Sequence, residues 1–250
     1  MQSAVSSQQS AVSSQQSAVS SQQSAVSSSF LYRLIRYICN LPVRAYRRIF
    51  RYILRRINRH RLTNKNFSVI SNNCTGAVIL SELGQRFDSP TVNLFFSGED
   101  FVKFCEDLKY YISCELEERL NPGVNYPVGT LGSGEKMIAV KFLHYENFTQ
   151  AKEKWDIRKK RIHWDNIYVI MDDCSSIEPK NIETMRKFDA LSYRKILLTR
   201  HEYGGVKSVL RFIHPDWFSV GIPFLWEYKS RLSFKKRYDD WDYVSFFNSR

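Results

Sequence analysis

From residue 66 onward, the hydrophobic positions alternate between short β-branched runs typical of strands and longer amphipathic runs typical of helices. The expected strands are Phe67–Ile70, Val92–Phe96, Met137–Leu143, Ile167–Met171 and Lys195–Thr199. The expected helices are a first one that ends near Gly84, a second that follows a cap at Ser97, Thr149–Arg161 and Pro179–Ala190. Strands that alternate with crossover helices form parallel sheets with helices on both faces. We therefore expect an α/β fold of two consecutive Rossmann-like parallel-sheet subdomains, at about residues 66–125 and 135–250.

The segment at residues 30–62 has a different pattern, in which apolar residues and arginines occupy opposite sides of a helix after an interruption at Pro42. The apolar side consists of Tyr46, Ile49, Phe50, Ile53, Leu54 and Ile57. The basic side consists of Arg44, Arg47, Arg48, Arg51, Arg55 and Arg59. This pattern predicts a cationic amphipathic helix.

The net charge of +12 comes mainly from this segment, because residues 30–62 hold ten arginines and no lysine or acidic residue, which leaves 27 basic and 25 acidic residues elsewhere. A cationic amphipathic helix suits the surface of an anionic membrane, where each arginine contributes on the order of 1 kcal/mol. Docking of the apolar side on the following domain is the alternative. Nucleic acid is not expected as a partner, since the domain has no second basic stripe. We expect a cytoplasmic protein attached peripherally to the inner face of the cytoplasmic membrane through residues 30–62.

Residues 1–29 are dominated by a heptapeptide repeat, in which the unit QQSAVSS occurs three times without change from Gln8 to Ser28. Its apolar residues are adjacent, as at Ala11 and Val12, and do not form coiled-coil positions, so we expect the segment to be disordered. A DNA repeat of the unit CAGCAGT, translated continuously, encodes this heptapeptide. Gain or loss of one DNA unit would shift the reading frame, so the repeat predicts phase-variable expression in a bacterium. A flexible linker with an accidental repeat is the alternative.

The cysteines and the hydropathy restrict the class further. The five cysteines form no CxxC pair and no cysteine–histidine cluster with zinc spacing, which favours a reduced cytoplasmic setting without a protein-bound metal. No stretch of about 18 apolar residues is present to span a bilayer, and the N-terminal residues lack the order of a signal peptide. We therefore expect a chain that is neither secreted nor membrane-spanning.

Ligands of open parallel sheets bind beyond the carboxyl ends of the strands. The polar residues expected near those ends are Asn72, Asn73 and Cys74 after the first strand, Asn93 within the second, His144 after the third, Asp172 and Asp173 after the fourth and His201 after the fifth. Among them, the expected substrate-binding residues are Asn72, Asn73, Asn93, Asp172 and Asp173.

Three runs of the chain, FSVISNNCTGAVILSELGQRFDSPTVNLFF, EKWDIRKKRIHWDNIYVIMDD and YDDWDYVSFFN, resemble an uncharacterised bacterial family. That family is usually labelled exopolysaccharide biosynthesis proteins and is met in capsule and lipopolysaccharide loci. The resemblance covers about Phe67 to Asn248 and leaves the repeat and the arginine-rich segment outside. It implies a two-subdomain α/β fold and a role in surface polysaccharide, without naming a reaction.

Cys74 is the candidate nucleophile, because the N-terminus of the next helix lowers the pKa of a thiol and offers N–H donors to an oxyanion. It would accept an acyl group from an acyl-CoA thioester, with His144 or His201 as the general base and Asn72 or Asn73 in the oxyanion site. The competing interpretation is a buried cysteine that only packs.

Asp172 and Asp173 carry a second hypothesis, a glycosyltransferase that uses a nucleotide-sugar donor and a divalent metal ion. An acidic pair that caps the next helix is the plainer interpretation. A non-catalytic assembly factor, the third hypothesis, would need none of these side chains. We favour a phase-variable O-acyltransferase whose acceptor is a surface glycan or a lipid-linked glycan precursor.

Overall fold

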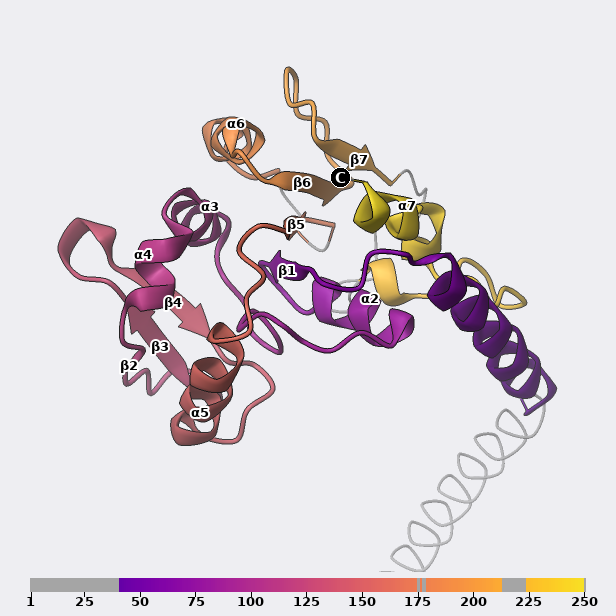
Figure 1. Ribbon diagram of the computed structural model, residues 1–250, viewed down its shortest axis with the longest axis horizontal. Helices are drawn as coiled ribbons and strands as arrows, with labels where there is room; N and C mark the ends of the chain where they lie inside the picture. The colour runs from indigo at the N-terminus through magenta and orange to yellow at the C-terminus, as the bar shows by residue number, and fades with distance from the viewer. Residues whose placement is uncertain (1–40, 175, 177–178, 213–223, 250) are drawn as a thin grey trace, which may run out of the picture. The chain divides into compact units, whose positions relative to one another are not determined.

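The structure is a computed structural model, and it describes residues 41–174, 176, 179–212 and 224–249. The heptapeptide repeat and the first part of the arginine-rich segment, residues 1–40, lie outside the described residues. The chain divides into two compact units, Met1–Arg51 and Tyr52–Arg250. Residues 41–51 of the first unit are helical; in the second, residues 52–61 are helical and the α/β domain follows (Figure 1). None of the described helices is long and apolar enough to cross a membrane.

A parallel sheet of four strands forms the centre of the domain. Its order is β1 (Ser68–Ser71), β5 (Ile167–Asp172), β6 (Arg194–Thr199) and β7 (Val209–Arg211), and each strand is parallel to its neighbours. Every residue of β1 and β5 is buried, as expected for strands covered on both faces. The structure confirms the α/β class with a parallel sheet and helices.

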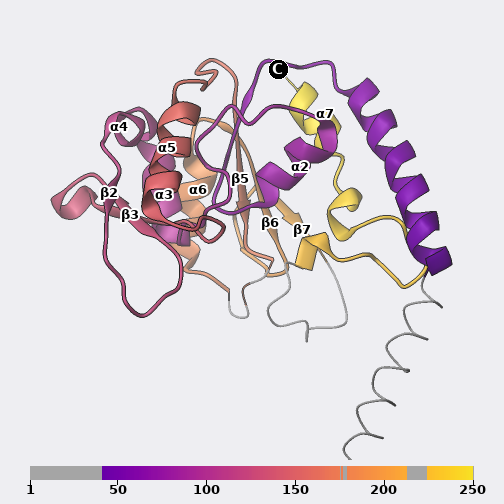
Figure 2. The ribbon, with the colours of Figure 1, turned by 90° about the horizontal axis from the view of Figure 1, so that it is seen from below.

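Helices cover both faces of this sheet. The helices are α2 (Thr75–Leu83), α3 (Gly98–Glu106), α4 (Leu108–Ser113), α5 (Phe148–Lys159), α6 (Ile182–Ala190) and α7 (Tyr243–Asn248), with short 3-10 turns at Gly134–Lys136, Phe224–Trp226 and Arg237–Asp240. Along β5, Tyr168 and Ile170 pack into the core beneath α2 and α7, whereas Val169 and Met171 pack into the core beneath α3 and α6. Figures 1 and 2 show these two pairs of helices on opposite faces.

The helix ends follow the local signals in the sequence. Gly84 terminates α2 in the left-handed conformation, with φ of 65°, which glycine adopts without steric cost. The Ser97 side chain accepts a hydrogen bond from the Asp100 N–H and so caps α3. Both predicted boundaries are confirmed.

A second, smaller sheet is antiparallel and consists of β2 (Glu117–Glu118), β3 (Val128–Leu131) and β4 (Ile138–Lys141), in that order. The run expected at Met137–Leu143 thus forms a strand, but outside the parallel sheet. The reason is the short connection at residues 132–137, which allows a hairpin and is too short for a crossover. Gly132 and Gly134 turn the chain there with φ of 74° and 57°.

The strand expected at Val92–Phe96 forms no ladder, and only an isolated bridge joins Phe95 to Lys141. Asn93 interrupts the extended backbone with φ of 62°. The only parallel sheet in the described residues therefore contains strands from both expected subdomains, because β1 pairs directly with β5.

Candidate functional site

The carboxyl ends of β1, β5 and β6 meet at one edge of the parallel sheet, because these strands are parallel neighbours. Asn72 and Asn73 follow β1, and Asp172 ends β5. The Asn72 side chain donates to the Asp172 carbonyl at 3.1 Å and accepts from the Asp172 N–H at 2.8 Å. The structure therefore brings together the side chains expected after the first and fourth strands.

The buried Asp172 carboxylate links the end of β1 to the start of α2. Its Oδ2 accepts hydrogen bonds from Thr75 Oγ1 at 2.6 Å and Asn73 Nδ2 at 3.1 Å. Its Oδ1 accepts one from the Cys174 N–H at 2.9 Å. Burial raises the pKa of Asp172, and these donors oppose the shift. The Asp172 and Asn73 side chains thus form hydrogen bonds to other groups of the protein.

Asp173 belongs to a different network. Its fully buried carboxylate accepts a hydrogen bond from the Tyr203 hydroxyl at 2.6 Å, and Lys180 Nζ lies 3.4 Å from its other oxygen. The Lys180 N–H in turn donates to the Tyr203 hydroxyl at 2.9 Å. Burial first, and the adjacent carboxylate second, raise the pKa of Tyr203. The two neighbouring aspartates therefore have separate partners, and the described residues contain no cluster of three or more His, Cys, Asp or Glu side chains arranged to hold a metal ion.

Cys74 is buried at the N-terminus of α2. Burial raises the pKa of its thiol, and the backbone N–H groups of Asn93 and Leu94 donate toward the sulfur and oppose that shift. The positive φ of Asn93 allows the chain to turn there. Two successive N–H groups of this kind stabilise a thiolate or a developing oxyanion. Asn93 thus contributes its backbone to the surroundings of Cys74, whereas the sequence suggested its side chain.

The two histidines were expected to act as general bases for this thiol. His144 is exposed after β4, and His201 is half-buried with a ring nitrogen 3.1 Å from the Ser176 carbonyl oxygen. No hydrogen bond joins either imidazole to Cys74 in the described part of the chain. Their role as general bases stays a prediction.

Tyr145 lies near Cys74 and is bound by Arg158, and neither residue was among those that the sequence suggested. The Tyr145 hydroxyl donates to the Val92 carbonyl at 3.1 Å and accepts from Arg158 Nη1 at 2.7 Å. Burial raises the pKa of Tyr145, Arg158 lowers it, and a negative charge on Cys74 would raise it further. The site therefore includes the Tyr145 phenol near the thiol, in the segment that follows β4, and the Arg158 guanidinium of α5 that binds this phenol.

Other residues that sequence reasoning missed are Thr75, Lys180 and Tyr203. Thr75 directly follows the candidate nucleophile Cys74, and Tyr203 lies in the glycine-containing loop after β6, so the local sequence pointed to both positions. The local sequence did not point to Lys180 or Arg158, because only tertiary packing brings these side chains to Asp173 and Tyr145.

Comparison with known proteins identifies relatives without a described activity. A family model described as "Domain of unknown function (DUF1919)" matches residues 45–248. A protein of Haemophilus influenzae, named only as uncharacterized, is 34% identical over 199 residues, which cover 79% of this chain and 92% of the relative. The family match begins well before Phe67. The helical residues 52–61 therefore fall inside the family's domain. The resemblance had placed them outside it, and that expectation was wrong.

Proposed function

The chain belongs to the DUF1919 family, and we propose that it is a transferase that adds an acyl group to a bacterial surface polysaccharide. Two features of the sequence support the pathway. The heptapeptide repeat is typical of translated DNA repeats that switch surface-modifying genes on and off, and the three runs quoted above resemble proteins of capsule and lipopolysaccharide loci.

The observation that carries the proposed chemistry is the position of Cys74. Its thiol lies at the start of α2, at the carboxyl edge of the sheet, with the N–H groups of Asn93 and Leu94 directed toward the sulfur. Ligands of parallel sheets bind at this edge. A thiol that has N–H donors beside it is suited to accept an acyl group from a thioester.

The reaction takes place in two exchanges. The Cys74 sulfur attacks the thioester carbonyl of acyl-CoA, the carbon–sulfur bond to CoA breaks, and the thiol proton leaves with CoA. A glycan hydroxyl then attacks the acyl-Cys74 carbonyl, the new ester forms, the carbon–sulfur bond to Cys74 breaks, and the hydroxyl proton goes to the Cys74 sulfur. Because burial raises the pKa of Cys74, the resting thiol is neutral, and the N–H groups of Asn93 and Leu94 act mainly on the charge that develops during each exchange.

A glycosyltransferase is supported less well by the geometry. Such an enzyme would use Asp172 or Asp173 as ligands of a nucleotide-bound metal ion. Asp172 already accepts three hydrogen bonds, and Asp173 is bound by Tyr203 and Lys180. Cys74 therefore carries the favoured hypothesis.

Two measurements test the proposal. The purified chain incubated with acetyl-CoA should gain the mass of an acetyl group in intact-mass spectrometry, and Cys74→Ala should abolish the gain. Cys114→Ala is the matched control, since Cys114 is a half-buried thiol outside the strand ends. Equal labelling of wild type and Cys74→Ala would refute the nucleophile.

The second measurement compares surface glycan from cells with the repeat in frame and out of frame. Loss of acetyl mass in the out-of-frame cells supports acyl transfer. Loss of a sugar supports the glycosyltransferase instead, and identical glycans would contradict both.

A further inference from the structure

The helical residues 52–61 expose their apolar side chains. Tyr52, Ile53 and Ile57 are 61%, 44% and 51% exposed. Large apolar side chains that share one helix face are normally turned toward the core of a domain. Here they are turned away from it, so the domain does not cover this face.

The contacts with the domain are made by the polar side chains of the same residues. Arg55 donates two hydrogen bonds to the buried Glu82 carboxylate of α2, at 2.5 and 2.8 Å. Arg59 donates to the carbonyls of Glu82 at 2.9 Å and Ser81 at 3.3 Å, in the last turn of α2. A cation at the C-terminus of a helix is stabilised by the helix dipole. Arginines therefore attach this segment to α2.

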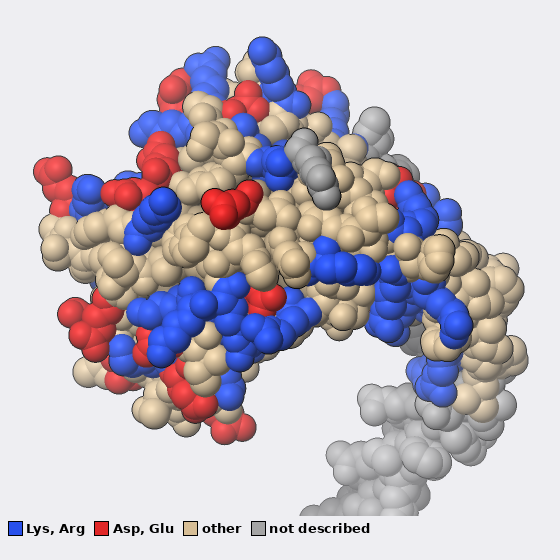
Figure 3. Space-filling model, in the orientation of Figure 1, with Lys and Arg blue, Asp and Glu red and all other residues tan. Residues whose placement is uncertain are grey.

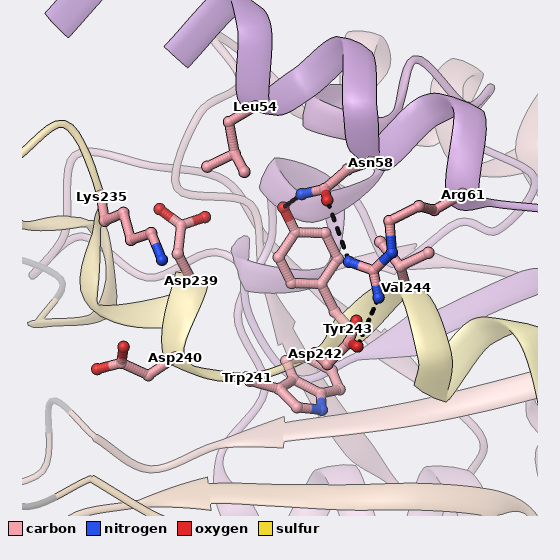
Figure 4. A pocket seen from close by; sticks show the side chains of 10 residues that line it. All are labelled: Leu54, Asn58, Arg61, Lys235, Asp239, Asp240, Trp241, Asp242, Tyr243 and Val244. Atoms are coloured by element: carbon pink, nitrogen blue, oxygen red, sulfur yellow. Dashed lines mark hydrogen bonds and ion pairs between the residues drawn. The ribbon is translucent and has the colours of Figure 1, made fainter. Parts of the chain in front are cut away.

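Two further polar contacts join the segment to the C-terminal residues (Figure 4). The buried Asn58 donates to the Tyr243 hydroxyl at 2.8 Å, and Arg61 donates to the Asp242 carboxylate at 2.6 Å. Leu54, predicted on the apolar side, instead lines the pocket of about 260 Å³ beside these residues. Of the residues predicted on the apolar side, Leu54 thus faces the domain, whereas Ile53 and Ile57 remain about half exposed.

Residues 41–51, taken separately, also have exposed large apolar side chains. These are Leu41, Tyr46, Ile49 and Phe50. In residues 41–51 and in residues 52–61 alike, the exposed apolar residues are interspersed with arginines and no acidic residue.

Charge decides the partner. A second copy of this helix would bring arginines against arginines without a carboxylate to pair them, which is unfavourable. An anionic bilayer offers phosphate groups to the arginines and a hydrocarbon boundary to the apolar side chains. Elsewhere, on the face in Figure 3, basic side chains have acidic side chains close by, which the sequence of residues 30–62 lacks.

We propose that the helix face with Tyr52, Ile53 and Ile57 binds the surface of an anionic phospholipid bilayer. The three side chains enter the headgroup boundary, and the exposed Arg56, next to Tyr52 on the helix surface, binds lipid phosphates. The α/β domain stays outside the bilayer, held to this helix by Arg55, Asn58 and Arg61. This inference is independent of the acyl-transfer proposal.

The test is sedimentation of the full chain with vesicles of phosphatidylglycerol and phosphatidylethanolamine or of phosphatidylcholine alone. Wild type should sediment with the anionic vesicles and much less with the neutral ones. The double variant Ile53→Ser/Ile57→Ser should bind at least about tenfold more weakly, because two apolar side chains no longer enter the boundary. Arg56→Gln should weaken binding by roughly fivefold, in line with about 1 kcal/mol per arginine.

The matched control is Leu120→Ser/Leu232→Ser, which removes two leucines that are 86% and 70% exposed elsewhere on the domain. This control should bind vesicles as wild type does. Equal binding by wild type and Ile53→Ser/Ile57→Ser would overturn the proposal, and so would equal sedimentation with neutral vesicles. A concentration-dependent dimer that the same double variant abolishes, without vesicle binding, would assign the face to a second copy instead.

Discussion

Helix α2 and the helical residues 52–61 are joined by Arg55 and Arg59, but they bury opposite kinds of side chain. Helix α2 turns Ile79, Leu80 and Leu83 into the core against the parallel sheet. Residues 52–61 turn arginine and asparagine toward the domain and expose tyrosine and isoleucine. The comparison teaches that amphipathic spacing identifies two faces of a helix without deciding which face the domain covers.

The two attachments also differ in their energetics. Burial of apolar side chains stabilises α2, at about 25 cal/mol per Å² removed from water. Residues 52–61 depend on charge-assisted hydrogen bonds whose arginines remain partly exposed, so salt screens them. Substitutions in α2 should therefore affect the free energy of unfolding most, and substitutions on the exposed face of residues 52–61 least.

The largest effect is expected for Ile79→Ala in α2. Ile79 is completely buried, and its truncation leaves a cavity, so the free energy of unfolding should fall by about 3 kcal/mol. Denaturant unfolding followed by circular dichroism measures this loss. Leu120→Ala, at an exposed site, is the control and should change the value by less than about 0.5 kcal/mol. An Ile79→Ala protein as stable as this control would refute the placement of α2.

The next effect concerns the first residue of α2. Thr75→Val keeps the side-chain shape and removes the hydrogen bond to the buried Asp172 carboxylate, at an expected cost of about 2 kcal/mol at neutral pH. The pKa of Asp172 is already raised by burial, so this carboxyl binds a proton more readily in the folded state than in the unfolded state. The contribution of Asp172 to the free energy of unfolding is fully present below pH 3.8, the ordinary pKa of an aspartate. It is lost as the pH rises through the higher pKa of the folded state.

Removal of the Thr75 donor should raise the pKa of Asp172 further and make that loss larger. The difference between wild type and Thr75→Val should therefore shrink when unfolding is measured below pH 3.8. A difference that stays constant with pH would show that Thr75 acts only by packing.

A smaller effect is expected at the junction of the two helices. Glu82→Gln weakens two charge-assisted hydrogen bonds to Arg55, which is half-exposed, so the cost should be about 1 kcal/mol. Unfolding at low and high salt tests the origin of the loss, because the cost should decrease as salt screens the pair. A cost equal to that of Ile79→Ala would mean that the junction is as important as the core.

The sequence predicted the features that depend on local signals. β5 and α2 were placed from their residue types and from the turn at Gly84, and the polar strand ends at Asn72 and Asp172 followed from the sheet topology. The sequence did not predict the antiparallel pairing of β4 with β3, because hydrophobic spacing identifies a strand without specifying which other strand it pairs with. The left-handed Asn93 was missed as well, because the surrounding run has the composition of a strand.

For the candidate site, too, the sequence predicted what depends on local signals and not what depends on tertiary contacts. Position along the chain identified Cys74 at the start of a helix, but its neighbour Tyr145, and Arg158 that binds Tyr145, come from segments distant in sequence. Whether Cys74 is ionised depends on burial and on nearby N–H groups, which only the fold determines. The orientation of the helix at residues 52–61 depends in the same way on the tertiary partners Glu82, Asp242 and Tyr243.

The smallest effect on stability is expected for Ile57→Ser, on the exposed face of residues 52–61. Ile57 is 51% exposed, so its replacement by serine should change the free energy of unfolding by less than about 0.5 kcal/mol, apart from a small loss of helix propensity. Denaturant unfolding in the absence of lipid measures this value, with Ile79→Ala as the internal standard. An effect near that of Ile79→Ala would mean that the domain covers this face in solution, and the contrast between the two helices would then be lost.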